Sequence, residues 1–176
     1  MIPQFNERGD LPPGFHGSTV DEFETRFVEN VPESKTRQPI FAGYLRYCKD
    51  LFNFDVPLEQ WLDGSFITNK IDPDDIDIMS LVDASKLTEN NEKHVKSLFI
   101  YHDHSNRGYL NSKYNCDPFV IAVYPPSHKY YHLTLKSIDY WYGAFGHVGG
   151  NPEKPSKGLI RIDLNDDRFK TKGVGI

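Results

Sequence analysis

Two stretches in the first half of the chain carry residue types and spacings that suit phosphate chemistry. Gly64 and Ser65 end a short apolar run, where a strand is expected to stop and a helical segment to begin. Glycine lets a phosphate approach the backbone closely, and the first N–H groups of a helix can bind it together with the Ser65 hydroxyl. Asp75 and Asp77 follow on the next expected strand, where they alternate with two isoleucines. The sequence therefore predicts a phosphate-binding turn close to a pair of carboxylates.

The two carboxylates are expected to share one face of that strand. Side chains two residues apart in a strand point to the same side, so Asp75 and Asp77 face one way while the isoleucines are buried on the other. Each carboxylate disfavours ionisation of its neighbour, and a divalent cation removes that cost. Ligands that are all oxygen, with room for substrate phosphates, suit Mg²⁺ or Mn²⁺. The plain alternative is a turn followed by a solvated strand edge.

One basic residue lies between the turn and the carboxylates. Lys70 is a candidate partner for a phosphate group, and the alternative is a solvated lysine. A phosphate-binding turn beside carboxylates is the arrangement that nucleotidyl transfer requires, because one metal ion holds the triphosphate and another activates the attacking hydroxyl. Gly64, Ser65 and Lys70 are therefore the candidate nucleotide-binding residues.

The Gly-Ser turn followed by Asp-x-Asp resembles the signature of the DNA polymerase β-like nucleotidyltransferase superfamily. The sequence also resembles a small bacterial family of nucleotidyltransferase-like proteins in three patches: IPQFNERGDLPPGFH, LDGSFITNKIDPDDIDI and KGLIRIDL. These patches span nearly the whole chain. The resemblance implies a single-domain nucleotidyltransferase-like fold in which Asp75 and Asp77 are catalytic metal ligands.

The resemblance further implies a third catalytic carboxylate on a later strand. Asp117, which opens the apolar run 118–124, is the first choice by position. Asp163 is the second choice and Asp139 the third. Pro118, directly after Asp117, is a departure from the family's pattern.

We therefore expect a Mg²⁺-dependent nucleotidyltransferase that moves a nucleoside monophosphate from a nucleoside triphosphate, ATP by default, to an acceptor hydroxyl. The acceptor is unidentified, with a protein or a small molecule favoured over nucleic acid. By analogy with small proteins of the superfamily, we expect a toxin–antitoxin or phage-defence setting and a partner protein from the same operon. The alternative is a catalytically inactive interaction module or antitoxin that binds a partner protein. A weaker third hypothesis is an enzyme that modifies nucleic acid.

The amino-acid composition argues against several functional classes. The 176 residues carry 20 Lys and Arg against 25 Asp and Glu, a net charge of −5, whereas proteins that bind nucleic acid usually show a basic surplus. Two cysteines are too few for a disulfide framework or a four-cysteine zinc site. No apolar run is long enough to span a membrane, and the N-terminal residues lack the order of a signal peptide. We therefore expect a cytoplasmic protein with no membrane partner.

Strands and helices are expected to alternate along the chain, which favours one α/β (α+β) domain with a mixed sheet and helices packed on it. We expect an extended arm over 1–18 and the single domain over 19–176. The expected helices begin at a capping box at Thr19 and at an amphipathic pattern from Ile40, with further helices over 86–99 and 137–147. The expected strands are 58–62, 75–79, 119–124, 130–135 and 159–164.

Overall fold

The computed structural model describes residues 1–100 and 104–164. Its centre is a five-stranded mixed sheet in the order β1-β5-β2-β3-β4. The strands are β1 (Gly14–Gly17), β2 (Pro57–Asp63), β3 (Ile76–Asp83), β4 (Cys116–Val123) and β5 (Gly158–Asp163). The β1–β5 and β3–β4 pairs are parallel, while β2 runs antiparallel to both β3 and β5. The predicted fold class, an α/β domain with a mixed sheet, is confirmed.

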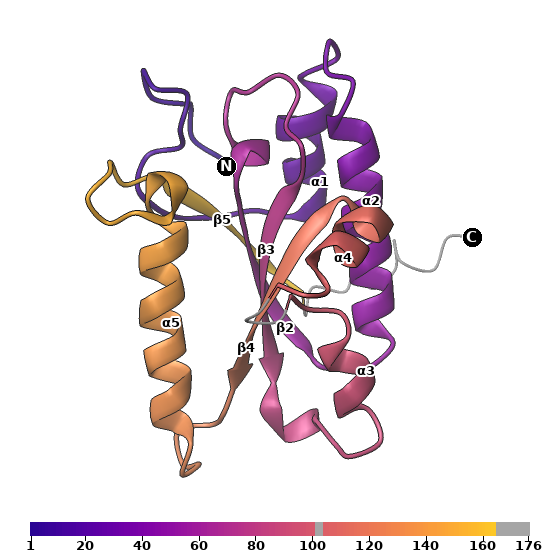
Figure 1. Ribbon diagram of the computed structural model, residues 1–176. Coiled ribbons are helices and arrows are strands. Elements are labelled where there is room, and N and C mark those ends of the chain that lie inside the picture. The colour runs from indigo at the N-terminus through magenta and orange to yellow at the C-terminus, as the bar shows by residue number, and fades with distance from the viewer. Residues whose placement is uncertain (101–103, 165–176) are drawn as a thin grey trace.

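Helices cover both faces of this sheet (Figure 1). The α-helices are α1 (Val20–Glu24), α2 (Arg37–Phe52), α3 (Glu92–Lys96), α4 (Arg107–Tyr114) and α5 (Tyr131–Phe145). Short turns of other helix types are η1 (Thr25–Glu29), η2 (Ser65–Ile67), η3 (Ala84–Lys86) and η4 (Val148–Gly150). The first four α-helices lie on one side of the sheet and α5 lies on the other (Figure 1). Among the described residues, no helix is both long enough and apolar enough to cross a membrane.

Alternate residues of the central strands enter two different hydrophobic layers. On β3, Ile76 and Ile78 are fully buried in the larger cluster that includes α2 and α4. Met79 belongs to the smaller cluster, in which α5 contributes Phe145 and, at its margin, Trp141. This alternation follows from the period of two along a strand. The central strands are therefore buried on both faces.

The helix predicted from Ile40 is α2, and Pro39 lies in its first turn, where the missing N–H costs nothing. Gly43 of α2 lies so close to α4 that a Cβ there would be 1.8 Å from the Tyr114 carbonyl oxygen. The capping prediction at Thr19 is also confirmed, because its hydroxyl accepts a 3.1 Å hydrogen bond from the backbone N–H of Glu22.

The strand predicted over 130–135 is wrong, because α5 begins at Tyr131 and runs through this segment. The polar–apolar alternation there also fits a helix, since one stripe at spacings of three and four residues faces the sheet. That stripe consists of Thr134, Ile138, Trp141 and Phe145. The Thr134 hydroxyl accepts from the backbone N–H of Tyr124 at 3.0 Å and donates to the Ala122 carbonyl at 3.1 Å. These bonds join the start of α5 to the end of β4.

Two other boundaries differ from the prediction. The helix predicted over 86–99 is reduced to η3 and the five residues of α3, because a turn over 88–91 separates them. The N-terminal segment is extended as predicted, but residues 14–17 form β1 and pair with β5. Leu11 is also buried in the core, so the segment packs as part of the domain.

Candidate functional site

Three aspartates lie side by side across three neighbouring strands. In the sheet register Asp63 of β2 is opposite Asp77 of β3, which in turn is opposite Asp117 of β4. Residues two positions further along these strands, such as Met79, pack toward α5, so the three carboxylates leave the sheet on the α5 face. Asp75 directly precedes β3, two residues before Asp77. The structure thus brings together the three carboxylates predicted from the sequence and adds a fourth, Asp63.

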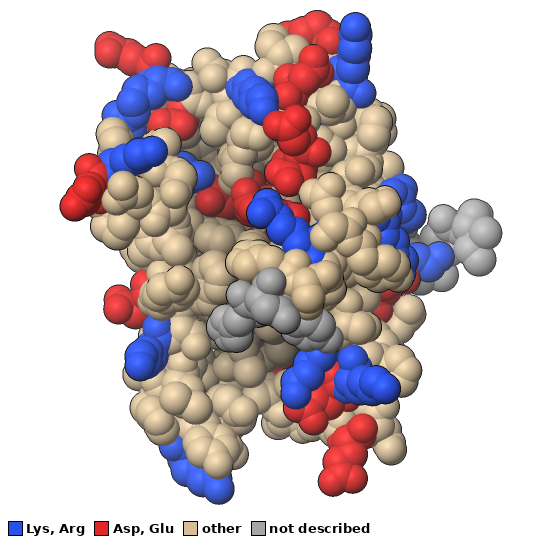
Figure 2. Space-filling model, viewed as in Figure 1, with Lys and Arg blue, Asp and Glu red and all other residues tan. Residues whose placement is uncertain are grey.

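Burial and mutual repulsion raise the pKa values of three carboxyl groups on β2 and at the start of β3. The pKa of Asp77 is raised to about 7, first by burial and then by the charges of Asp63, Asp75 and Asp117. The pKa of Asp75 is raised by burial and by the charge of Asp117. Burial also raises the pKa of Asp63. Figure 2, which has the same view as Figure 1, shows acidic side chains gathered in the upper half of the molecule, with Lys and Arg side chains beside them.

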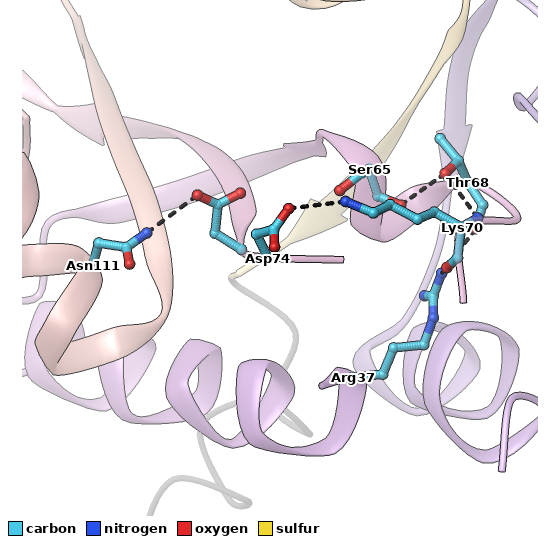
Figure 3. Close-up of polar contacts among 7 residues, drawn as sticks. Arg37, Ser65, Thr68, Lys70, Asp74 and Asn111 are labelled. Atoms are coloured by element: carbon cyan, nitrogen blue, oxygen red, sulfur yellow. Dashed lines mark hydrogen bonds and ion pairs between the residues drawn. The ribbon is translucent and has the colours of Figure 1, made fainter. Parts of the chain in front are cut away.

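Two cations partly balance this charge. Lys157 places Nζ 2.6 Å from Asp63 Oδ1, and both side chains are almost completely buried. Arg107, the first residue of α4, forms an ion pair with Asp117 Oδ2. One turn further along α4 is Asn111 (Figure 3), whose amide nitrogen lies 3.2 Å from Asp75 Oδ2 and 3.4 Å from Asp117 Oδ1. Side chains of α4 therefore contact two of the four carboxylates.

The Gly64–Ser65 turn lies directly against the carboxylates. Gly64 has φ +86°, and a Cβ there would be 2.4 Å from Asp77 Oδ2. Both the left-handed backbone and the lack of space therefore require glycine. The helical segment predicted to start here is the single turn η2, and Thr68 closes it through two bonds to the Ser65 carbonyl (Figure 3).

The segment after this turn is held by a residue that sequence analysis missed. Arg37 is buried, and its guanidinium donates to five backbone carbonyls, two of which belong to residues drawn in Figure 3, Thr68 and Lys70. These carbonyls belong to Phe27, Phe66, Thr68, Lys70 and Ile71. Four of the five lie between residues 66 and 71, so α2 fixes the backbone that follows the Gly64–Ser65 turn. An arginine in the first turn of an amphipathic helix gives no sequence signal of this role.

The remaining sequence candidates lie apart from the cluster. Lys70 pairs with Asp74 at 2.8 Å, and both side chains are exposed (Figure 3). Asp163 is opposite Glu59, toward the other end of β2 from Asp63. Asp139 is an exposed residue of α5. Neither of the two alternatives for the third carboxylate therefore lies in the row, which Asp117 completes.

Pro118 is compatible with its position because, among the strands of residues 1–100 and 104–164, β4 lies at the edge of the sheet, where a proline needs no N–H for pairing. Its carbonyl accepts a 2.7 Å hydrogen bond from the N–H of Ile100. Asp117 is completely buried within β4 rather than preceding it. The departure from the expected pattern therefore does not displace this carboxylate.

Sequence analysis also missed Asp63, Asn111 and Lys157 as members of the cluster. Asp63 had a usable signal, because it ends an apolar strand directly before Gly64. Asn111 and Lys157 had none, since they come from separate connections and reach the site only through the fold.

The chain matches a protein family over residues 3–163, described as a family of unknown function, DUF6932, and it belongs to that family. No curated protein and no solved structure matches the chain.

Proposed function

We propose that this member of the DUF6932 family is a Mg²⁺-dependent nucleotidyltransferase of the polymerase β-like type. It would transfer a nucleoside monophosphate, AMP by default, to a hydroxyl of a protein or small molecule in the cytoplasm. The observation that carries the proposal is the grouping of Asp75, Asp77 and Asp117 beside the Gly64 turn. Three carboxylates on neighbouring strands next to a close-approach turn are suited to a metal-bound triphosphate.

The carboxylates fit a divalent cation in charge and in donor type. Burial and repulsion raise the pKa values of Asp75 and Asp77, because they leave the negative charge there without full compensation. Carboxylate oxygens with room for phosphates suit Mg²⁺ or Mn²⁺. As the described side chains stand, no three His, Cys, Asp or Glu residues are arranged to hold a metal ion. Asp75 and Asp117 would therefore have to give up contacts with α4 when they bind one.

The chain's own residues position the substrate in this proposal. The missing side chain at Gly64 lets Asp77 lie directly against the turn, while backbone N–H groups and the Ser65 hydroxyl would bind a phosphate. Arg37 holds the following backbone in place, so the turn is preorganised. A cation on Asp75, Asp77 and Asp117 would neutralise charge on the triphosphate. The acceptor oxygen would then form a bond to the α-phosphorus as the bond to the departing pyrophosphate breaks.

A labelling experiment tests this function. The purified protein is incubated with each α-³²P-labelled nucleoside triphosphate, Mg²⁺ or Mn²⁺ and a cell lysate, and the same reaction is run with Asp75→Ala/Asp77→Ala. Transfer of label to protein, RNA or a small molecule that the double variant abolishes would support the proposal. Asp139→Ala, on the exposed side of α5, is the matched control and should transfer label normally. No transfer with any nucleotide would count against the enzyme.

The second candidate is a non-catalytic module or antitoxin that binds a partner protein. It is favoured by Arg107 and Lys157, which already neutralise two carboxylates, and by exposed aromatics on α5. Tyr140 is 67% exposed and Tyr142 43%. The toxin–antitoxin or phage-defence setting and the operon partner remain part of this proposal. Capture of an endogenous complex without transferase turnover would favour the module, whereas turnover by a purified monomer would exclude it.

A further inference from the structure

Both side-chain oxygens of Asp117 are engaged by α4. Arg107 pairs with Oδ2, and the Asn111 amide lies 3.4 Å from Oδ1. The Asp117 side chain has no exposed surface, whereas that of Arg107 is 52% exposed. The guanidinium therefore occupies the solvent side of a carboxylate that a metal ion would need.

Lys157, the second cation of the site, is held more firmly than Arg107. Lys157 is only 10% exposed, its partner Asp63 only 8%, and its backbone N–H donates to the Gly146 carbonyl at 2.9 Å. Lys157 is thus fixed in the wall of the site. Arg107 is the first residue of α4, so its backbone is held by the helix. About half of its long side chain is exposed to water, where ion pairs are weak and side chains reorient readily.

We propose that Arg107 is a built-in counter-ion of Asp117, which leaves when a divalent cation binds and then binds the triphosphate of the nucleotide. This inference rests on the proposed function. The cation and the guanidinium compete because both need Asp117 Oδ2. Once displaced, the planar guanidinium can pair with phosphate oxygens through two parallel hydrogen bonds. The charges of Asp75 and Asp77 keep it near the site, since they also attract it.

The inference predicts two effects of opposite sign for Arg107→Met. Mn²⁺ affinity, measured by electron paramagnetic resonance of free Mn²⁺, should increase about fivefold because the competitor of the cation is gone. Affinity for an ATP analogue with a methylene between the α- and β-phosphates, measured at saturating Mn²⁺, should decrease about tenfold. If Arg107 only stabilised α4, its replacement would not strengthen Mn²⁺ binding while it weakened nucleotide binding.

Lys113→Met is the matched control. It removes one positive charge from the same helix, but Lys113 pairs with Asp50 on α2 at 3.1 Å, away from the carboxylate row. It should leave both affinities within about twofold of wild type. In the wild-type protein, the Arg107 side-chain Nε signal, assigned by its absence from Arg107→Lys, should shift with Mg²⁺ and shift again with the analogue.

The outcomes separate this inference from the proposed function. If the wild type binds Mn²⁺ and Asp77→Asn abolishes binding, but Arg107→Met changes neither affinity, the counter-ion role is wrong and the metal site stands. The role is also wrong if Arg107→Met weakens both affinities or if Lys113→Met reproduces its effects. If the wild type binds no Mn²⁺, the proposed function and the counter-ion role fail together.

Discussion

Asp77 and Asp117 lie directly opposite each other on adjacent parallel strands, although all of α3 and α4 lies between them in the chain. Both helices lie on the face of the sheet that α2 covers, so the chain returns along that face before β4 begins (Figure 1). Arg107 and Asn111, which contact Asp117, belong to this same connection. One strand–helix–strand unit thus supplies two carboxylates of the row and the side chains that hold one of them.

We expect Asp77→Asn to stabilise the metal-free protein. Because the folded pKa of Asp77 is about 7 and its ordinary value is 3.8, the folded state retains a proton that the unfolded state has released. Stability therefore falls as pH rises through this window, and asparagine avoids the loss. Thermal unfolding in EDTA should show a midpoint a few degrees above wild type at pH 8, since about 1 kcal/mol shifts it by roughly 2–4 °C. The gain should be smaller at pH 5, and Asp139→Asn should give none.

We expect Mn²⁺ affinity to depend on pH through the same carboxyl group. Below pH 7 a proton on Asp77 competes with the cation, so affinity should rise with pH and level off above about 7. The limiting slope should be about tenfold per pH unit for one displaced proton. Calorimetric titration between pH 5.5 and 8.5 measures this profile. A flat profile in the wild type would mean that Asp77 is not a ligand.

We expect Gly64→Ala to destabilise the protein and weaken nucleotide binding. Alanine at φ +86° is strained, and its methyl group would collide with Asp77 Oδ2. A cost of about 1–3 kcal/mol in the free energy of unfolding is expected from urea titration. Gly143→Ala is the control, because that helical position has open space around it and should gain about 0.5–1 kcal/mol. Equal stability of the two variants would contradict the requirement for glycine.

We expect Arg37→Met to be among the most destabilising single changes in the chain. It leaves five carbonyls, two of them in fully buried hydrogen bonds, without their donor, at a cost of about 3–5 kcal/mol. Arg37→Lys should recover little, since an ammonium cannot reach carbonyls on several sides. Urea unfolding gives the free energies. Arg46→Met, on the exposed side of α2, should change stability by less than about 0.5 kcal/mol, and a similar loss there would overturn this explanation.

The local sequence pattern was sufficient to predict those features of the site that depend on a single strand or turn. The alternation around Asp77 predicted its strand and its place on the face opposite Ile76 and Ile78, and the glycine before Ser65 predicted the close turn. The choice of Asp117 depended on a resemblance, and the register shows why that position lies beside Asp77. Metal binding and nucleotidyl transfer, with the cation and the acceptor that they involve, are predictions.

The features that the sequence did not predict depend on tertiary contacts. The segment 130–135 alternates as a strand would, yet its Thr134 bonds to the end of β4 and its apolar stripe covers the sheet, so it is helical. Lys157 reaches Asp63 from a loop far along the chain. Arg37 binds carbonyls that only the folded chain brings together. No pattern within a short window carries these relationships.

The position of β5 also affects the order of events during synthesis. It lies between β1 and β2 in the sheet but follows all the other strands in the chain. On a ribosome, β1 would have no pairing partner, and β2 would expose one backbone edge, until residues 158–163 emerged. Such distant pairing slows folding and prolongs exposure to aggregation. The carboxylate row lies on β2, β3 and β4, but Lys157, the buried partner of Asp63, is synthesised directly before β5, so the charge of the row is balanced only when that edge closes.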